Sequence, residues 1–284
     1  MDAAQLLNGV ALGSLLMVLS SGLAMIYGLR GVANFAHGAL YMSGAYIAYS
    51  VSDKVSFWLA LIVAPLVLAA VGAVLELVFF RPLQHRSHIE LGLITFGVAL
   101  VLERVVVLIW GERTHRVTPP EFLQGTTSLF GIEYPSYRLA IIVIALCLAA
   151  GLVFWLRNTE TGLHIRAASQ DIETASIMGI NVDRVSTVVV TLGSALAGLA
   201  GTLAAPYVAL DPGMGNAFLI VVLIVVVVGG IGSIGGAMIA GMGLGVIQTV
   251  ATVWSPAFAV IVPYAALTIV LLWRPTGLAG KRVS

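Results

Sequence analysis

The chain has 284 residues, of which 60% are hydrophobic and 10% are charged, and its mean hydropathy is +1.05. A soluble domain carries about 25% charged residues, so this composition excludes one and indicates an integral membrane protein. The formal net charge of +1 excludes an electrostatic nucleic-acid binder, which needs a basic face. The single cysteine, Cys147, excludes a disulfide framework, and its position inside an apolar run predicts core packing.

Apolar segments of lipid-spanning length follow one another along the chain. A helix needs about 20 apolar residues to cross the hydrocarbon of a bilayer. The segments that reach or approach this length are 6–28, 32–51, 57–80, 89–110, 139–156, 185–210, 217–228, 235–253 and 257–273. Segment 217–228 is short, which predicts a half-span or part of a broken helix. We therefore predict an all-α polytopic membrane protein of eight or nine such helices, with one transmembrane domain over residues 1–284.

Basic residues in the connections predict the orientation, because loops rich in Lys and Arg stay in the cytoplasm. Alternating crossings place nine basic residues on one side and four on the other. The first side collects Arg30, Arg81, Arg86, Arg157, Arg166, Arg184, Arg274, Lys281 and Arg282, and the second collects Lys54, Arg113, Arg116 and Arg138. This predicts an external N-terminus, an internal C-terminus and a cytoplasmic segment 157–184.

Segment 157–184 is the one long polar stretch that has lipid-length apolar runs on both sides. Its centre predicts a short helix, which Ser169 or Asp171 caps at the N-terminus and Gly179 ends. Small and apolar residues at spacings of three and four share one face of this helix: Ile172, Ala175, Ser176 and Gly179. The segment is either an ordinary helix that joins two spans or a surface on which another protein acts.

Polar residues inside the spans are the next candidates, because ionisable groups in hydrocarbon face protein or water. Asn34, His37 and Tyr41 share one helical face near the first turn, where they either cap and pack a helical hairpin or line a path or inner gate. Glu103 and Arg104 lie deep in the fourth segment, where they either pair with another helix or line a path. Glu76 is near the inner end of its segment and is expected to snorkel or to pair with Arg81 or Arg86.

Small residues recur every four positions in two of the segments. Gly193 and Gly201 belong to one such ridge, and Gly241 and Gly245 belong to another. Ridges of this kind let helix backbones approach closely in lipid, so we predict that these four glycines pack helices within the subunit or across a dimer.

Several enzyme classes are poorly supported. Gly230, Gly232 and Gly235 fit a dinucleotide-binding pattern, but no acid follows Asp211, so we interpret them as a tight turn. The only lysines, Lys54 and Lys281, are not in a phosphate-binding loop, so any ATPase must be another polypeptide. His85 and His88 are expected to form an exposed loop pair rather than a metal site. We predict a non-enzymatic chain with no cofactor and no metal of its own.

Three motifs together resemble a known family. They are NFAHGALYMSGAYIAY at 34–49, RAASQDIETASIMGINVDRVS at 166–186 and GGIGSIGGAMIAG at 229–241. The chain resembles, over nearly its whole length, the permease subunits of branched-chain amino acid ABC transporters, the LivH-like half of a LivH/LivM pair. The resemblance implies an ABC importer permease fold with an inverted-repeat core, in a bacterial inner membrane.

The resemblance also implies partners and a site. ABC importer permeases present a coupling helix with the pattern E-A-A-x-x-x-G, which Glu173, Thr174, Ala175 and Gly179 match with threonine at the second position, while Asp171 precedes it. The implied partners are a LivM-like second permease, two ABC ATPases that bind ATP, and an extracytoplasmic solute-binding protein. The implied solutes are branched-chain or similar small apolar amino acids, although relatives of this fold also carry urea, short amides or aromatic acids. The alternative is a self-sufficient secondary transporter or channel that uses Glu103, Arg104 and Glu76.

Overall fold

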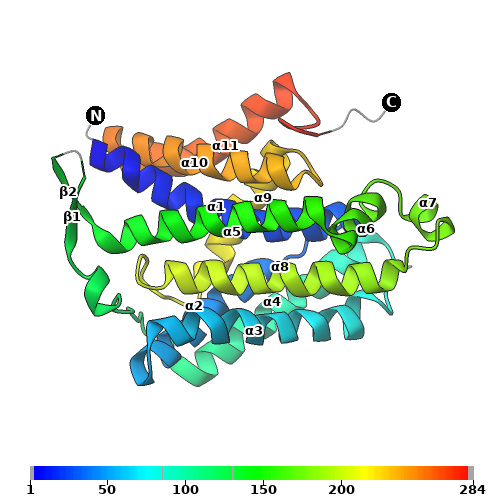
Figure 1. Ribbon diagram of the computed structural model, residues 1–284, viewed down its shortest axis with the longest axis horizontal. Helices are drawn as coiled ribbons and strands as arrows, with labels where there is room; N and C mark the ends of the chain where they lie inside the picture. The colour runs from blue at the N-terminus through cyan, green and yellow to red at the C-terminus, as the bar shows by residue number, and fades with distance from the viewer. Residues whose placement is uncertain (1–2, 85, 130, 281–284) are drawn as a thin grey trace.

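The computed structural model describes residues 3–84, 86–129 and 131–280. Within them, each of the nine apolar segments contains a long helix (Figure 1). The long helices are α1 (Ala3–Arg30), α2 (Ala36–Lys54), α3 (Phe57–Leu75), α4 (His88–Trp110), α5 (Ser136–Asn158), α8 (Val182–Ala204), α9 (Met214–Gly229), α10 (Ile234–Trp254) and α11 (Pro256–Trp273). A π-helical turn (Glu76–Phe80) continues α3. His85, Lys281 and Arg282, which entered the sequence analysis, lie outside the described residues.

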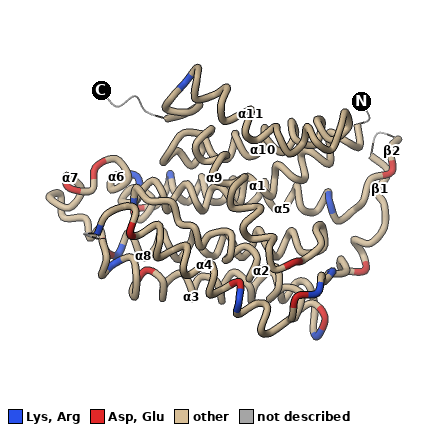
Figure 2. Tube along the Cα trace, turned by 180° about the vertical axis from the view of Figure 1, so that it is seen from behind, with Lys and Arg blue, Asp and Glu red and all other residues tan. Residues whose placement is uncertain are grey.

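The helices form a bundle whose two ends differ. A hairpin of β1 (Thr126–Leu129) and β2 (Ile132–Pro135) covers one end, in the connection between the predicted segments 89–110 and 139–156. The short helices α6 (Glu160–Ala168) and α7 (Ile172–Ile177) lie at the opposite end (Figure 1). We call these the hairpin end and the α7 end. Most charged residues gather at the two ends, as expected for a bundle whose middle lies in hydrocarbon (Figure 2).

Seven of the described helices are long and apolar enough to cross a membrane, so the protein is a multi-pass membrane protein. The two long helices outside this set, α2 and α9, both follow an interruption. Residues 31–35 are not helical, so α2 begins later than the predicted segment 32–51. Helix α8 ends at Ala204 rather than at residue 210, and residues 205–213 lead irregularly into α9. Helix α9, at the predicted short segment, has only 16 residues, whereas α2 has 19 residues and falls outside the set because it is less apolar.

Hydrogen bonds to protein groups satisfy the backbone N–H groups at the first interruption. Irregular backbone at membrane depth is tolerated only where protein or water surrounds it. The Thr95 hydroxyl accepts a hydrogen bond from the N–H of Phe35 at 3.1 Å, and the Asn34 side chain accepts one from the N–H of Ala36 at 3.1 Å. The Asn34 carbonyl accepts from the N–H of His37 at 3.1 Å. These bonds replace the helical ladder where the chain turns back into the bundle.

Helices α1–α4 and α8–α11 repeat the same plan in opposite orientations. In each set a long helix is followed by an interruption and then by a shorter helix. Arg81, after the π-helical turn, binds Thr187 near the start of α8, whereas Arg30 at the end of α1 binds Glu76 in that same turn. Helices α1 and α8 therefore run in opposite directions. Helix α10 packs along α1 as α3 packs along α8. The predicted all-α polytopic membrane fold is confirmed, and its two halves have the inverted arrangement that the resemblance implies.

The four glycines predicted to pack helices all lie at close contacts inside the subunit. A Cβ added at Gly193 would lie 2.7 Å from the Ile26 side chain, and one at Gly241 would lie 2.9 Å from the Met17 nitrogen. Those at Gly201 and Gly245 would overlap neighbouring backbone, of Tyr41 on α2 and of Gly13 on α1. Without hydrophobic drive between helices in lipid, such backbone approach supplies the packing energy.

Replacing Gly201 by alanine tests this packing. Its Cβ would overlap the Tyr41 carbonyl, which belongs to backbone that cannot rotate away. We expect Gly201→Ala to lower the free energy of unfolding by about 1–3 kcal/mol. Gly243→Ala on α10 is the matched control, because nothing lies within 4 Å of its Cβ. It should stabilise the helix slightly, by up to about 1 kcal/mol. Thermal unfolding in detergent measures both, and equal midpoints for the two variants would contradict the assigned contact.

Candidate functional site

Helix α7 begins with a strong N-terminal cap. The Asp171 carboxylate accepts hydrogen bonds from the N–H groups of Glu173 and Thr174, both at 3.0 Å, and one from the Thr174 hydroxyl. These bonds, that of the hydroxyl first, lower the pKa of Asp171 below its ordinary value. Asp171 therefore stays ionised at neutral pH, where its charge favours the positive end of the helix. Of the two caps that the sequence allowed, the structure uses Asp171.

Gly179 ends α7 in a Schellman motif. The N–H of Gly179 donates to the Ser176 carbonyl at 3.0 Å, and the N–H of Ile180 donates to the Ala175 carbonyl at 3.1 Å. Gly179 has φ +86°, a left-handed conformation that favours glycine. Asn181 then caps α8 by accepting from the N–H of Arg184 at 2.9 Å. Both termini of this six-residue helix are therefore fixed by local hydrogen bonds.

Most of α7 is exposed. On the face that the sequence predicts only Ala175 is buried, whereas Ile172, Ser176 and Gly179 are exposed. Glu173 is exposed too, and so are two large apolar side chains, Ile177 at 81% and, just after the helix, Met178 at 77%. Exposed apolar side chains beside an acid, at the charged end of the bundle, are typical of a surface that binds another protein. Ala175 therefore packs against the chain, while the other residues of α7 lie on the surface.

Arg81 connects the start of α8 to the end of α3. Its guanidinium donates to the Thr187 hydroxyl at 3.0 Å and to the Asp183 carbonyl at 3.2 Å, and it lies 3.9 Å from the Asp183 carboxylate. Asp183 follows the cap residue Asn181, so these contacts lie close in sequence to α7.

Glu76 is fully buried and pairs with Arg30, not with Arg81 or Arg86 as the sequence suggested. The expectation from local spacing was wrong because tertiary packing brings the end of α1 against the π-helical turn. The Arg30 guanidinium also lies 5.9 Å from the centre of the Phe80 ring. Removing one partner of a buried ion pair costs about 3–5 kcal/mol, so this pair holds α1 to α3 firmly.

Asn34, His37 and Tyr41 are buried inside the subunit at the interruption before α2. The His37 ring nitrogen lies 3.0 Å from the Leu19 carbonyl, which is about 16 Å along the axis of α1 from its end at Arg30. The Tyr41 ring lies 4.7 Å from that of Phe218 on α9. His37 therefore lies well inside the bundle, and all three side chains are buried among the described residues.

Glu103 and Arg104 lie on the outside of the subunit, away from that buried group. Glu103 is half-buried and accepts a hydrogen bond from the Asn216 amide at 3.1 Å, whereas Arg104 is exposed. Asn216 lies in the first turn of α9, close to Phe218. Glu103 on α4 and Tyr41 on α2 therefore contact opposite sides of the start of α9. The sequence analysis missed Asn216, although a polar residue at the start of a short apolar run was a usable signal.

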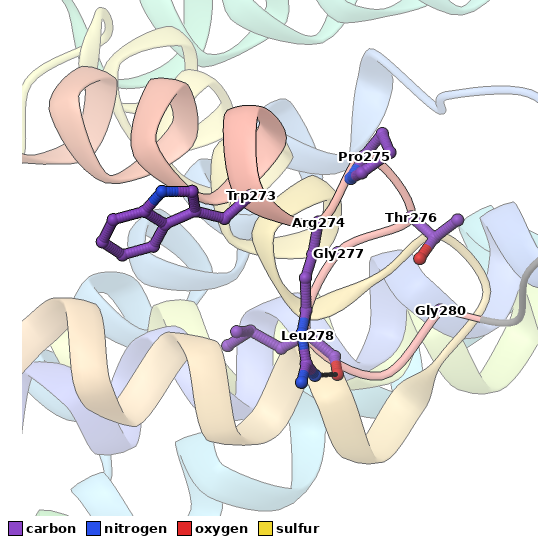
Figure 3. Close-up of a pocket in the computed structure, with 7 residues that line it drawn as sticks. All are labelled: Trp273, Arg274, Pro275, Thr276, Gly277, Leu278 and Gly280. Carbon is purple, nitrogen blue, oxygen red and sulfur yellow. Dashed lines mark hydrogen bonds between the residues drawn. The ribbon is translucent and has the colours of Figure 1, made fainter.

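A cavity of about 380 Å³ lies at the end of α11, lined by residues 273–278 and by Gly280 (Figure 3). The Arg274 guanidinium donates to the Leu278 carbonyl at 3.4 Å, and the N–H of Leu278 donates to the Val228 carbonyl at 2.8 Å. None of the predicted site residues lines this cavity. It results from the way this segment folds back on the end of α9.

Comparison with known proteins places this architecture in a family. The family model described as "Branched-chain amino acid transport system / permease component" matches residues 5–271. The permease protein BraD of the high-affinity branched-chain amino acid transport system of Pseudomonas aeruginosa is 31% identical over 98% of this chain and 95% of its own length. The corresponding LivH of Salmonella typhimurium is 32% identical, again over 98% of this chain and 95% of its own length.

Two further relatives extend the comparison. The permease protein LivM of Salmonella typhimurium is 27% identical over 92% of this chain and 67% of its own length. The solved structure of PsaBC from Streptococcus pneumoniae in complex with Fab superposes with a TM-score of 0.50 at 13% identity, over 93% of this chain and 90% of that one. That likeness supports the fold alone. On the family model and the relatives above 30% identity, this chain belongs to the family of permease components of branched-chain amino acid transport systems.

Proposed function

We propose that this chain forms half of the membrane pathway of an ATP-driven importer and that α7 is the handle by which a separate ATPase drives it. The observation that carries the proposal is α7 itself, which is capped at both ends, lies at the tip of the molecule and exposes Ile177 and Met178 (Figure 1). A partner that accepts it needs an apolar cleft with a basic group for Glu173. ATP would bind to that partner, because this chain has no phosphate-binding loop, and we propose no cofactor of its own.

Membership of the family supports the remaining partners and the solute. Relatives named for branched-chain amino acid transport favour leucine, isoleucine, valine or a similar small apolar amino acid. Similarity to both LivH and LivM favours a second, LivM-like permease, and an extracytoplasmic binding protein would deliver the solute. We place the α7 end in the cytoplasm of a bacterium, with the chain in the inner membrane and the N-terminus outside, on the basis of the basic residues.

Contacts beyond α7 suggest how movement reaches the membrane. Residues 178–181 join α7 directly to α8, whose first turns hold Arg81. Five residues before Arg81, Glu76 binds Arg30, which borders the interruption at 31–35. We propose that closure of the ATPases pushes α7 and that this route passes the displacement to the start of α2. The ATPases drive transport only if they bind one of two arrangements more tightly.

The proposed activity has a direct test. The chain, reconstituted in proteoliposomes with the second permease, the ATPases and the binding protein encoded beside it, should accumulate leucine, isoleucine or valine only when ATP is supplied. The chain alone should move no solute. Nucleotide-independent uptake by the purified chain would instead support the self-sufficient transporter or channel.

The handle is tested by Gly179→Ala with Gly111→Ala as its control. Both glycines have positive φ, +86° and +82°, and nothing lies within 4 Å of either Cβ, so each substitution strains only the local backbone. For the left-handed conformation of Gly179 the strain is about 1–2 kcal/mol. Gly111, with ψ −176°, lies in a region restricted essentially to glycine, so its substitution strains the backbone at least as much. At Gly179 the strain should reshape the end of α7 and lower the solute moved per ATP hydrolysed. Gly111 lies at the hairpin end, and its variant should keep the wild-type ratio. Equal ratios for the two variants would count against α7 as the handle.

The route is tested by Arg81→Ala with Arg86→Ala as its control. Arg86 is close in sequence, but its ion-pair partner is Glu90 within its own segment, at 3.8 Å, so it does not join α8. Arg81→Ala should lower the solute moved per ATP by about two- to thirty-fold, which corresponds to a coupling free energy of about 0.5–2 kcal/mol. ATP hydrolysis by the assembled complex should persist. A loss of the same size in both variants would show a general effect of charge rather than transmission through α8.

A further inference from the structure

Helix α4 carries charged groups at a depth where the bundle should face hydrocarbon. Glu103 and Arg104 precede Trp110, the last residue of α4, by about 10 Å along the helix axis. The rest of the surface around them is apolar, with Leu100 and Val101 both exposed. A charged side chain at such depth is costly in lipid and normally faces protein or water.

The subunit compensates these charges only in part. Glu103 receives one neutral hydrogen bond, from Asn216 at 3.1 Å. Among the described residues, no ion pair or hydrogen bond is formed by the Arg104 guanidinium. In contrast, the deep charge of Glu76 is buried and paired with Arg30. The surface around Glu103 and Arg104 is therefore unsuited to lipid as it stands.

The opposite membrane face of the subunit is apolar rather than charged. A groove of about 550 Å³ between α5 and α8 is lined by apolar side chains, including Val143, Trp155 and Leu196. Cys147 lines it too and is exposed, so the prediction that this thiol packs in the core was wrong. A groove without charged lining is well matched to lipid acyl chains.

Helix α9 joins the charged surface to the other half of the repeat. It lies between α4 and α11 in both views (Figures 1 and 2), and it packs on α11 while Asn216 binds Glu103. Helices α4 and α11 are the last helices of the two inverted halves. Almost all of α11 is exposed, so nothing within the described chain covers this side.

We infer that the face of α4 and α9 around Glu103, Arg104 and Asn216 is where the second permease of this family seats, with an acidic or amide group of that partner opposite Arg104. This inference rests on the proposed function, which supplies the second permease, and adds the face that it occupies. Partner contact removes the charges from lipid and satisfies the free guanidinium. It also places the polar residues at the boundary between two permeases.

Photocrosslinking in the assembled transporter tests the assignment. p-Benzoylphenylalanine is introduced in place of Val101 on α4 or, as the matched control, in place of Val143 on α5. The two valines are 62% and 60% exposed, so the reporter has similar access at both positions. After irradiation in native membranes, mass spectrometry of the adduct identifies the protein captured. ATP-driven uptake in the same membranes reports separately on the proposed function.

We expect the Val101 position to yield an adduct with the second permease and the Val143 position to yield none. A permease adduct at Val143 alone, or at neither position while uptake is normal, would overturn the assignment and leave the importer function intact. In a second measurement, Arg104→Leu should lower the recovery of the second permease with this chain several-fold, whereas Val105→Leu should not. Unchanged or increased recovery for Arg104→Leu would also overturn it, because a lipid-facing site gains from leucine.

Discussion

The crossing of α2 and α9 at Gly38 and Gly215 is the contact on which the rest of the bundle depends. A side chain on Gly38 would overlap the Gly215 carbonyl, so the first turns of the two helices meet backbone to backbone. This approach brings the starts of α2 and α9 together where the two interrupted segments enter the bundle. The backbone of the first interruption is tolerated because protein groups, among them the Thr95 hydroxyl and the Asn34 side chain, satisfy it. The long helices of each half then pack around this central pair.

The connection of α7 to this core is short, because only residues 178–181 separate it from α8. A six-residue helix has little intrinsic stability, and its caps must hold it. Asp171 and Gly179 satisfy the free backbone groups at its two ends, so α7 keeps its shape while it contacts little of its own chain. The proposed coupling role needs a helix that is rigid in itself and firmly joined to the spans. Residues 178–181 join α7 to α8, and the contacts of Arg81 with Asp183 and Thr187 join α8 to the end of α3.

The sequence predicts most of this fold because its signals are local. Spans follow from hydropathy, while the Asp171 cap and the Gly179 stop follow from residue type and spacing. The interruption at 31–35 was not predicted, because Val32 and Ala33 are as apolar as a span and hydropathy does not register backbone conformation. The pairing of Glu76 was wrong for a related reason, since local spacing favoured Arg81 whereas packing brings Arg30. Long-range partners of this kind depend on helix crossings that one sequence does not specify.

The exposed Cys147 and the buried Ala175 show a second limit of prediction from the sequence. In lipid an apolar residue is compatible with the core and with the surface, so Cys147 on an apolar helix carries no information about which way it faces. Ala175 is buried whereas Ile172, Ser176 and Gly179 on the same predicted face are exposed, so spacing alone did not show which residue of α7 packs against the chain. Charged residues do discriminate, because hydrocarbon rejects them. The buried Glu76 finds its counter-ion inside the subunit, whereas Arg104 lies on the surface and pairs with no acid among the described residues. The placement of charge, more than the placement of apolar residues, therefore indicates which contacts lie within this subunit and where the proposed second permease would complete them.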